Sequence, residues 1–154
     1  MSKFERGFSL LEVLIVVGIM TIISSIGAGF YVNYNKGVEI DSAVQVVVFD
    51  LKQAQGKSMI GEGGFKWGIH FVNAADDYYE IFSTPTDYSS GSKVILSTNY
   101  LPGGIIFSDP ATDATKDIIF NKISGGTSAS SVAIVAGSNT KTISVSSIGN
   151  VSVQ

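Results

Sequence analysis

The feature that most constrains this chain is a stretch of 23 residues, Val13–Asn35, that contains no charged side chain. At about 1.5 Å of rise per residue, roughly 20 helical residues cross the ~30 Å hydrocarbon core of a bilayer. Lys3 and Arg6 precede the stretch, whereas Lys36 on its other side is soon followed by acidic residues. This asymmetry predicts one membrane-spanning helix over residues 8–35, with the N-terminus in the cytoplasm and the bulk of the chain outside it.

The composition bounds what the rest of the chain can be. The 154 residues are 45% apolar and 15% charged, and the mean hydropathy of +0.32 excludes a disordered chain. The length suits a single domain. The absence of cysteine excludes disulfides, thiolate zinc sites and a cysteine nucleophile. Because the apolar excess lies largely in residues 8–32, the remainder should be an ordinary polar-faced domain.

Glu12 does not suit the two simplest explanations of the apolar stretch. These are a secretory signal peptide cleaved near the small residues 27–29, and a plain signal anchor. A carboxylate at the centre of a spanning helix costs roughly 2.5–3.5 kcal/mol, and less near the helix end. Neither signal gains anything from that cost, so Glu12 is a candidate functional residue that needs a partner.

The segment around this glutamate, residues 6–12, reads RGFSLLE and resembles the cleavage motif of type IV prepilins and type II secretion pseudopilins. The resemblance implies a leader of residues 1–7 that a prepilin peptidase removes by cutting after Gly7. The same enzyme would then methylate Phe8, the new N-terminus. In the family, the counterpart of Glu12 is thought to neutralise the terminal amine of a neighbouring subunit.

The physical chemistry of the new terminus agrees with this resemblance. An ammonium on Phe8 and a carboxylate on Glu12 attract strongly in a low-dielectric setting, and each is costly if left alone. We therefore expect Glu12 to set the register between subunits. The implied partners are the peptidase/methyltransferase, other pilin or pseudopilin subunits, the assembly platform and, before assembly, membrane lipid.

Two glycines late in the apolar stretch, Gly27 and Gly29, have two interpretations. Glycine weakens a helix by about 1 kcal/mol relative to alanine, so the helix could melt there in a filament. Small residues equally allow close packing between helices.

Residues 36–60 predict an amphipathic helix that packs on the rest of the domain. Apolar or small residues recur there at steps of three or four. They are Ile40, Val44, Val47, Val48, Leu51, Ala54 and Ser58. Glycines at positions 61, 63 and 64 should end the helix, so a continuous helix from Phe8 to Ile60 would have about 53 residues and a length of roughly 80 Å.

From residue 65 the apolar period changes to two, which predicts strands. Residues 65–72 alternate so that one aromatic face should turn inward. Further strands are expected near 78–82, 93–96, 105–107, 117–121, 131–136 and 141–145, with turns at 101–104, 137–139 and 149–150. The predicted fold is α+β: a long N-terminal helix packed on a small antiparallel β-sheet domain over residues 65–154. The order of these segments is similar to the GspH/FimT-like minor pseudopilins and pilins, a looser resemblance than the N-terminal one.

No pattern for catalysis or a cofactor stands out. His70 is the only histidine, and on a polar strand face we expect an ordinary surface or hydrogen-bonded residue. Asp109, Asp113 and Asp117 lie four apart, and two more aspartates occupy 76–77. Loop carboxylates can bind calcium, but the EF-hand spacing is absent, and a solvated acidic loop is the competing interpretation. We expect no enzyme activity, no cofactor and no metal.

The charge balance argues against nucleic acid as a partner. After loss of the leader the chain would carry 8 basic and 12 acidic side chains, and residues 105–154 contain only three lysines. DNA binding needs clustered basic residues, so this composition argues against DNA binding by this subunit alone.

The sequence therefore predicts a structural subunit, processed after Gly7, that sits in the cytoplasmic membrane and then enters a type IV pilus or a type II secretion pseudopilus. One alternative is a signal-anchored extracytoplasmic binding or adhesion domain that does not polymerise. A secreted hydrolase is disfavoured because its catalytic constellation is missing.

Overall fold

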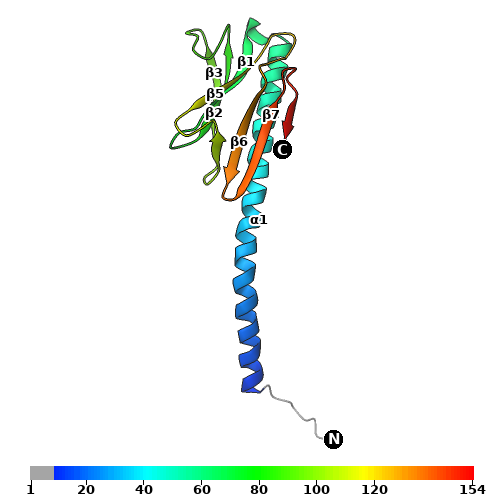
Figure 1. Ribbon diagram of the computed structural model, residues 1–154, viewed down its shortest axis with the longest axis vertical. Helices are drawn as coiled ribbons and strands as arrows, with labels where there is room; N and C mark the ends of the chain where they lie inside the picture. Colours follow the sequence, from blue (N-terminus) through cyan, green and yellow to red (C-terminus); the bar gives the residue numbers. More distant parts are fainter. Residues whose placement is uncertain (1–8) are drawn as a thin grey trace. The chain divides into compact units, whose positions relative to one another are not determined.

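The computed structural model describes residues 9–154, in which one long helix is followed by eight strands (Figure 1). Helix α1 runs without interruption over Leu10–Met59, which confirms the predicted long helix to within two residues at its start and one at its end. The leader predicted over residues 1–7 and the residue Phe8 lie outside the described residues. The chain divides into two compact units, one up to Asn35 and one over Lys36–Gln154, and each is described by itself.

In the first unit, the side chains of residues 10–25 are all exposed. The helical backbone continues through Gly27 and Gly29 in the single chain, and melting at these glycines in a filament stays a prediction. The side chains of residues 26–33 lie outside the described residues, and helix packing there stays a prediction.

None of the helices described between residues 9 and 154 combines the length and apolar character needed to cross a bilayer. The membrane-spanning segment predicted over residues 8–35 is thus not confirmed.

The part of α1 in the second unit turns the predicted apolar or small residues between Ile40 and Ser58 toward the core as one stripe. The stripe residues are buried except for the partly buried Val48, and Ala43 and Asp50 are buried beside them. The helix ends where predicted: Gly61 adopts the left-handed conformation with φ of 68° and leads into a short 3-10 helix, η1, over Glu62–Gly64.

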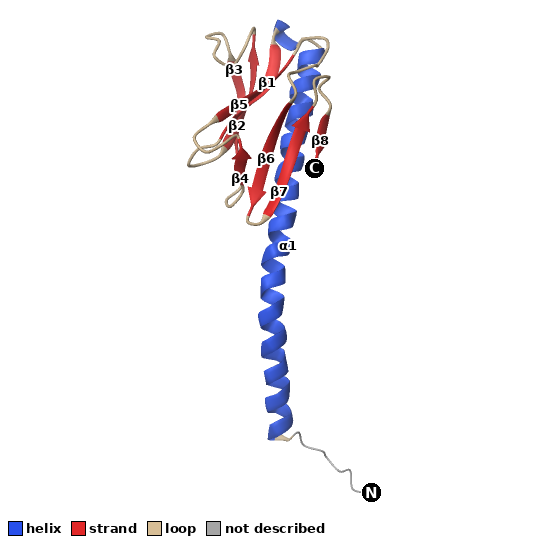
Figure 2. Ribbon diagram, in the orientation of Figure 1, coloured by secondary structure: helices blue, strands red, loops and turns tan. Residues whose placement is uncertain are grey.

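The eight strands form two antiparallel sheets of four strands each (Figure 2). The first sheet has the order β3-β2-β1-β5 and the second the order β4-β6-β7-β8. The strands are β1 (Lys66–Val72), β2 (Tyr78–Thr84), β3 (Val94–Tyr100), β4 (Ile106–Asp109), β5 (Thr115–Phe120), β6 (Ser130–Ala136), β7 (Asn139–Val145) and β8 (Val151–Val153). The α+β fold predicted from the sequence is confirmed.

Aromatic rings join the two sheets in one core with the α1 stripe. The Phe71 ring of β1 meets the Phe107 ring of β4 edge-on, with centroids 5.6 Å apart, and lies 5.9 Å from the Tyr79 ring of β2. Edge-to-face pairs of this kind add to the stabilisation from buried area alone. The core therefore depends on both sheets as well as the helix.

The prediction that strand β1 turns only one face inward was wrong. Gly68 and His70, on the supposed polar face, are buried as well. The strand lies between β2 and β5, and the Tyr88 ring of the segment 85–93 covers its outer face. At Gly68 a Cβ atom would come within 2.5 Å of the Ile118 carbonyl oxygen, so glycine is needed for the approach of β5.

Candidate functional site

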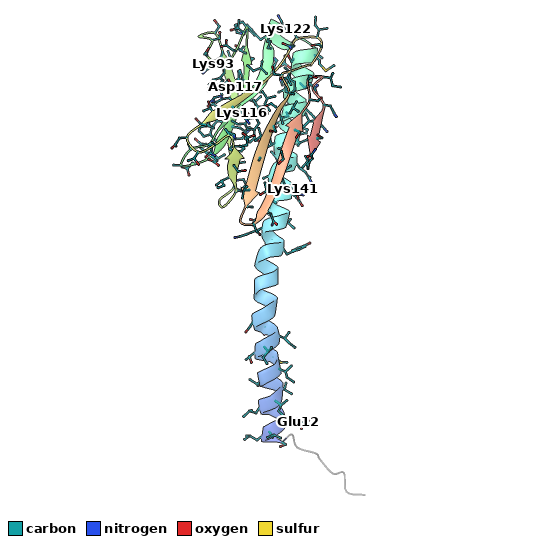
Figure 3. All side chains as sticks on the ribbon, viewed as in Figure 1. Glu12, Lys93, Lys116, Asp117, Lys122 and Lys141 are labelled. Carbon is teal, nitrogen blue, oxygen red and sulfur yellow. The ribbon has the colours of Figure 1, made fainter. Side chains whose placement is uncertain are left out.

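The N-terminal part of α1 combines an apolar surface with a single carboxylate. Glu12 lies in the first turn of the helix and is exposed (Figure 3). It is the one charged side chain among residues 10–35. Large apolar side chains are exposed on every side of this stretch, namely Leu10, Leu11, Val13, Leu14, Ile15, Val16, Val17, Ile19, Met20, Ile22 and Ile23.

The position of Glu12 determines which partners this apolar surface can pack against. A carboxylate in the first turn is favoured by the helix dipole. If the apolar side chains around it become buried against other helices or lipid, the charge needs a cationic partner, because an unpaired buried charge is costly. Phe8, whose amine is the predicted partner, and Gly7, the predicted cleavage residue, lie outside the described residues.

His70 sits in a layered cluster on the outer face of the first sheet. Its Nδ1 contacts the carboxylate of Asp117 on β5, and its ring stacks on the Tyr88 ring with centroids 3.6 Å apart. The Lys93 ammonium lies 3.5 Å from the centroid of the Tyr88 ring. The Tyr88 hydroxyl donates a hydrogen bond of 2.5 Å to Glu80 on β2. Burial, and then the bond to Glu80, raise the pKa of the Tyr88 hydroxyl.

These contacts give His70 a structural role. It was predicted to be an ordinary surface or hydrogen-bonded residue, and the structure shows it hydrogen-bonded but buried. Its partners Asp117 and Tyr88 hold the segment 85–93 against β1 and β5. Each polar group is engaged by another member of the cluster, an arrangement that fixes a loop.

A groove of about 760 Å³ lies between α1 and the edge strand β3, within the second unit. Among the residues that line it, the buried Asp50 accepts a hydrogen bond of 2.6 Å from the Tyr79 hydroxyl and one of 3.4 Å from the Asn99 amide. Burial, and then the bond to Asp50, raise the pKa of Tyr79. Asp50 was not predicted as a functional residue. The available signal was its spacing, three residues after Val47 and four before Ala54, which places it on the buried stripe.

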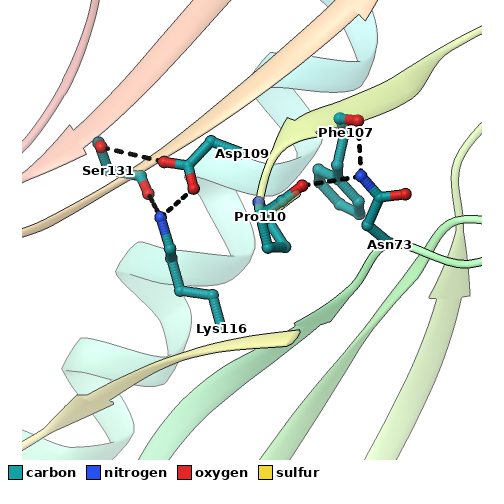
Figure 4. A network of polar contacts seen from close by, with 6 residues as sticks. All are labelled: Asn73, Phe107, Asp109, Pro110, Lys116 and Ser131. Atoms are coloured by element: carbon teal, nitrogen blue, oxygen red, sulfur yellow. Dashed lines mark hydrogen bonds and ion pairs between the residues drawn. The ribbon is translucent and has the colours of Figure 1, made fainter. Parts of the chain in front are cut away.

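Three of the five aspartates considered for calcium have partners within the chain, namely Asp77, Asp109 and Asp117. Asp109 on β4 contacts the Lys116 ammonium of β5, and the same ammonium donates a bond of 2.8 Å to the Ser131 carbonyl of β6 (Figure 4). Because β5 belongs to the first sheet and the other two strands to the second, this network fastens the sheets together. Asp117 contacts His70 instead.

Asp77 and Asn73 fasten the sheets at a second point. Asp77 is buried and accepts backbone N–H bonds of 2.5 Å from Phe107 and 3.0 Å from Ala74. The Asn73 amide donates bonds of 2.8 and 2.7 Å to the carbonyls of Phe107 and Pro110 (Figure 4). For this buried aspartate the interpretation as a solvated acidic loop was wrong. Across residues 9–154 no group of three or more metal-ligating side chains comes together.

Comparison with known proteins supports the N-terminal motif. Residues 2–28 match the family described as the prokaryotic N-terminal methylation motif. This match supports a type IV pilin-like precursor that is processed at its N-terminus, and such chains are structural. Neither the curated proteins nor the solved structures gave a match to this chain.

Proposed function

We propose that this chain is a structural subunit of a type IV pilus or a type II secretion pseudopilus. The prepilin peptidase would cut it after Gly7 and methylate Phe8. One observation carries the proposal: the methylation motif over residues 2–28 coincides with a helix whose side chains at 10–25 are exposed and apolar around the single carboxylate of Glu12.

The apolar part of α1 would have two successive environments. Before assembly, residues 8–35 would anchor the subunit in the cytoplasmic membrane, with the N-terminus in the cytoplasm. After assembly, the same side chains would pack against those of other subunits in the filament core. In both settings they leave water, which is the main source of favourable free energy.

Glu12 would fix the register between neighbouring subunits in the filament. The methylated amine of Phe8 is still a cation, and a carboxylate of a neighbouring copy satisfies it in the low-dielectric core. A wrong register would leave both charges buried without a partner, at a cost of several kcal/mol per ion. The pair therefore selects one arrangement of the subunits.

We further propose that the subunit is of the GspH/FimT-like minor type. The support is the order of segments from the end of α1 to the strands β1, β2 and β4, together with two four-stranded sheets packed on the helix. In this role residues 36–154 would be presented to other subunits, cargo or surfaces.

The test is a Glu12→Ala variant expressed in cells that make the filament. We expect the variant to be cut after Gly7 like the wild type, but to enter sheared filaments at least roughly tenfold less, because the register pair is lost. A matched control is Thr21→Ala, whose hydroxyl bonds only to the Gly18 carbonyl of the same helix.

The alternative function, a signal-anchored binding or adhesion domain, predicts a different result. A plain anchor does not use Glu12, so the variant and the control would behave alike and neither would appear in filaments. Normal entry of the Glu12→Ala protein into filaments would contradict the proposed role of the glutamate.

A further inference from the structure

The most exposed apolar side chains of the second unit gather where α1 ends. Ile123, Ile148 and Ile60 are 82%, 78% and 77% exposed, more than any other large apolar side chain described in residues 36–154. Single exposed isoleucines are ordinary on a protein surface, but three from the same end form a feature that needs an explanation. We define the α1-end surface as residues 57–66, 121–127 and 146–150.

Hydrogen bonds hold the three segments of this surface side by side. The Ile123 N–H donates to the Ser58 carbonyl at 3.2 Å, which joins the loop 121–127 to the end of the helix. The Thr127 N–H donates to the Ser147 carbonyl at 3.1 Å, which joins that loop to the turn 146–150. The isoleucines therefore come from one fixed platform.

The backbone at the α1-end surface is strained. Ile123 has a φ of 70°, a left-handed conformation that a β-branched side chain adopts only at a cost. Because the Ile123 side chain is exposed, it adds almost no buried apolar area to the core. At Gly149, with φ of 83°, a Cβ would lie 2.2 Å from the Gly125 carbonyl oxygen, so the turn needs glycine to pack this closely. Strain that is kept without a gain in packing points to function.

The net charge of the α1-end surface is opposite in sign to the net charge of residues 36–154. The α1-end surface carries three lysines and one glutamate, whereas residues 36–154 carry eight lysines and eleven acidic residues. Lys122 lies at this end of the unit (Figure 3), where its ammonium donates a hydrogen bond of 2.9 Å to the Gly64 carbonyl. Lys57 lies 2.7 Å from Glu62 and 4.5 Å from the centroid of the Trp67 ring. Lys66 begins strand β1.

We propose that the α1-end surface docks onto a bilayer of anionic phospholipid. The isoleucines would enter the boundary between headgroups and acyl chains, and the lysines would pair with headgroup phosphates. Charge complementarity favours an anionic surface, and the protruding isoleucines favour lipid over nucleic acid, because neither a phosphate backbone nor a base edge rewards aliphatic side chains that make no hydrogen bonds.

The test uses the full chain in phosphatidylcholine nanodiscs, so that its apolar N-terminal helix is already covered. Because the chain has no cysteine, Ser147→Cys gives one site on this surface for an environment-sensitive dye, and Ser108→Cys gives an exposed control site on β4. On adding vesicles of phosphatidylcholine with phosphatidylglycerol, we expect dye at position 147, and not at 108, to brighten and shift to the blue. Neutral vesicles should give little change.

Substitutions then separate the apolar from the electrostatic contribution. Ile123→Ser and Ile148→Ser should each weaken vesicle binding by roughly tenfold, since each removes an apolar side chain from the lipid. Lys122→Gln should weaken binding and reduce its dependence on salt. Ile106→Ser, at an exposed isoleucine of β4, is the matched control and should bind like the wild type.

Several results would overturn the proposal. They are an equal response at positions 147 and 108, an equal response to neutral vesicles, and binding that persists in both isoleucine variants. A response to duplex DNA as strong as that to anionic vesicles would identify a nucleic-acid surface instead. Thermal melting of each variant verifies the fold, and Lys122→Gln, which removes only a surface charge, remains informative if an isoleucine variant unfolds.

Discussion

The two parts of helix α1 differ in how their apolar side chains are covered. Over residues 40–58, the apolar side chains form one stripe that two sheets cover. Over residues 10–25, apolar side chains face every direction and remain exposed. One part is covered by its own chain, whereas the other is left exposed. Under the proposed function, lipid or further copies would cover that second part, and one helix would serve both folding and assembly.

The same contrast holds for the carboxylates. Asp50 in the covered part accepts hydrogen bonds from Tyr79 and Asn99 of the same chain. Glu12 in the exposed part has solvent around it. A buried carboxylate whose partners lie within the chain stabilises one fold. A carboxylate that must find its partner on another molecule can specify how molecules assemble.

The largest expected effect comes from equal truncations in the two parts of the helix. Leu51→Ala should lower the free energy of unfolding of residues 36–154 by about 2–5 kcal/mol, because Leu51 is fully buried. Leu14→Ala, at an exposed leucine, should leave that free energy within about 0.5 kcal/mol of the wild type. Denaturant unfolding followed by tryptophan fluorescence measures both. Equal losses of unfolding free energy in the two variants would contradict the contrast between the covered and the exposed part of α1.

A smaller effect is expected when the two carboxylates are exchanged for alanine. Asp50→Ala leaves the buried Tyr79 hydroxyl without its acceptor and should cost roughly 1–3 kcal/mol. Glu12→Ala should not change the unfolding of residues 36–154 measurably. The same denaturant experiment applies, and Asp50→Asn, which keeps an acceptor oxygen, should lose less than the alanine variant.

The smallest effect should appear as a dependence on alkaline pH. The pKa of Tyr79 is raised in the folded protein by burial and by the bond to Asp50. Above the ordinary tyrosine pKa of about 10, the unfolded chain holds fewer protons than the folded one, so stability should fall as pH rises. Tyr79→Phe should make that fall shallower, with Tyr88 supplying part of the remainder. Tyr100→Phe, at an exposed tyrosine, should leave the slope unchanged.

Sequence patterns predicted the backbone elements well because their signals are local. The stripe from Ile40 to Ser58 and the glycine at position 61 predicted where α1 packs and ends. Period-two alternation and glycine turns located seven of the eight strands, and the predicted turn at 149–150 precedes the eighth. Each of these signals depends on neighbours within a few residues.

Features that depend on contacts distant in sequence were missed. The burial of His70 requires Tyr88, eighteen positions away, to fold over the outer face of β1. The division into two sheets follows from strand pairings that are distant in sequence, such as β1 with β5 and β4 with β6. The sequence also contained Ile60, Ile123 and Ile148 without any pattern that would bring them to one end of the fold. Periodicity does not encode such tertiary placement.

The most direct test of the central claim is the mass of the mature N-terminus, since the claim is that α1 begins as a processed pilin-like helix. We would isolate the protein from the membrane and filament fractions of its native host and fragment the N-terminal peptide. We expect a peptide that starts at Phe8 and carries one added methyl group on its amine. An intact Met1, or a start near Phe30 as expected of a cleaved secretory signal, would contradict it.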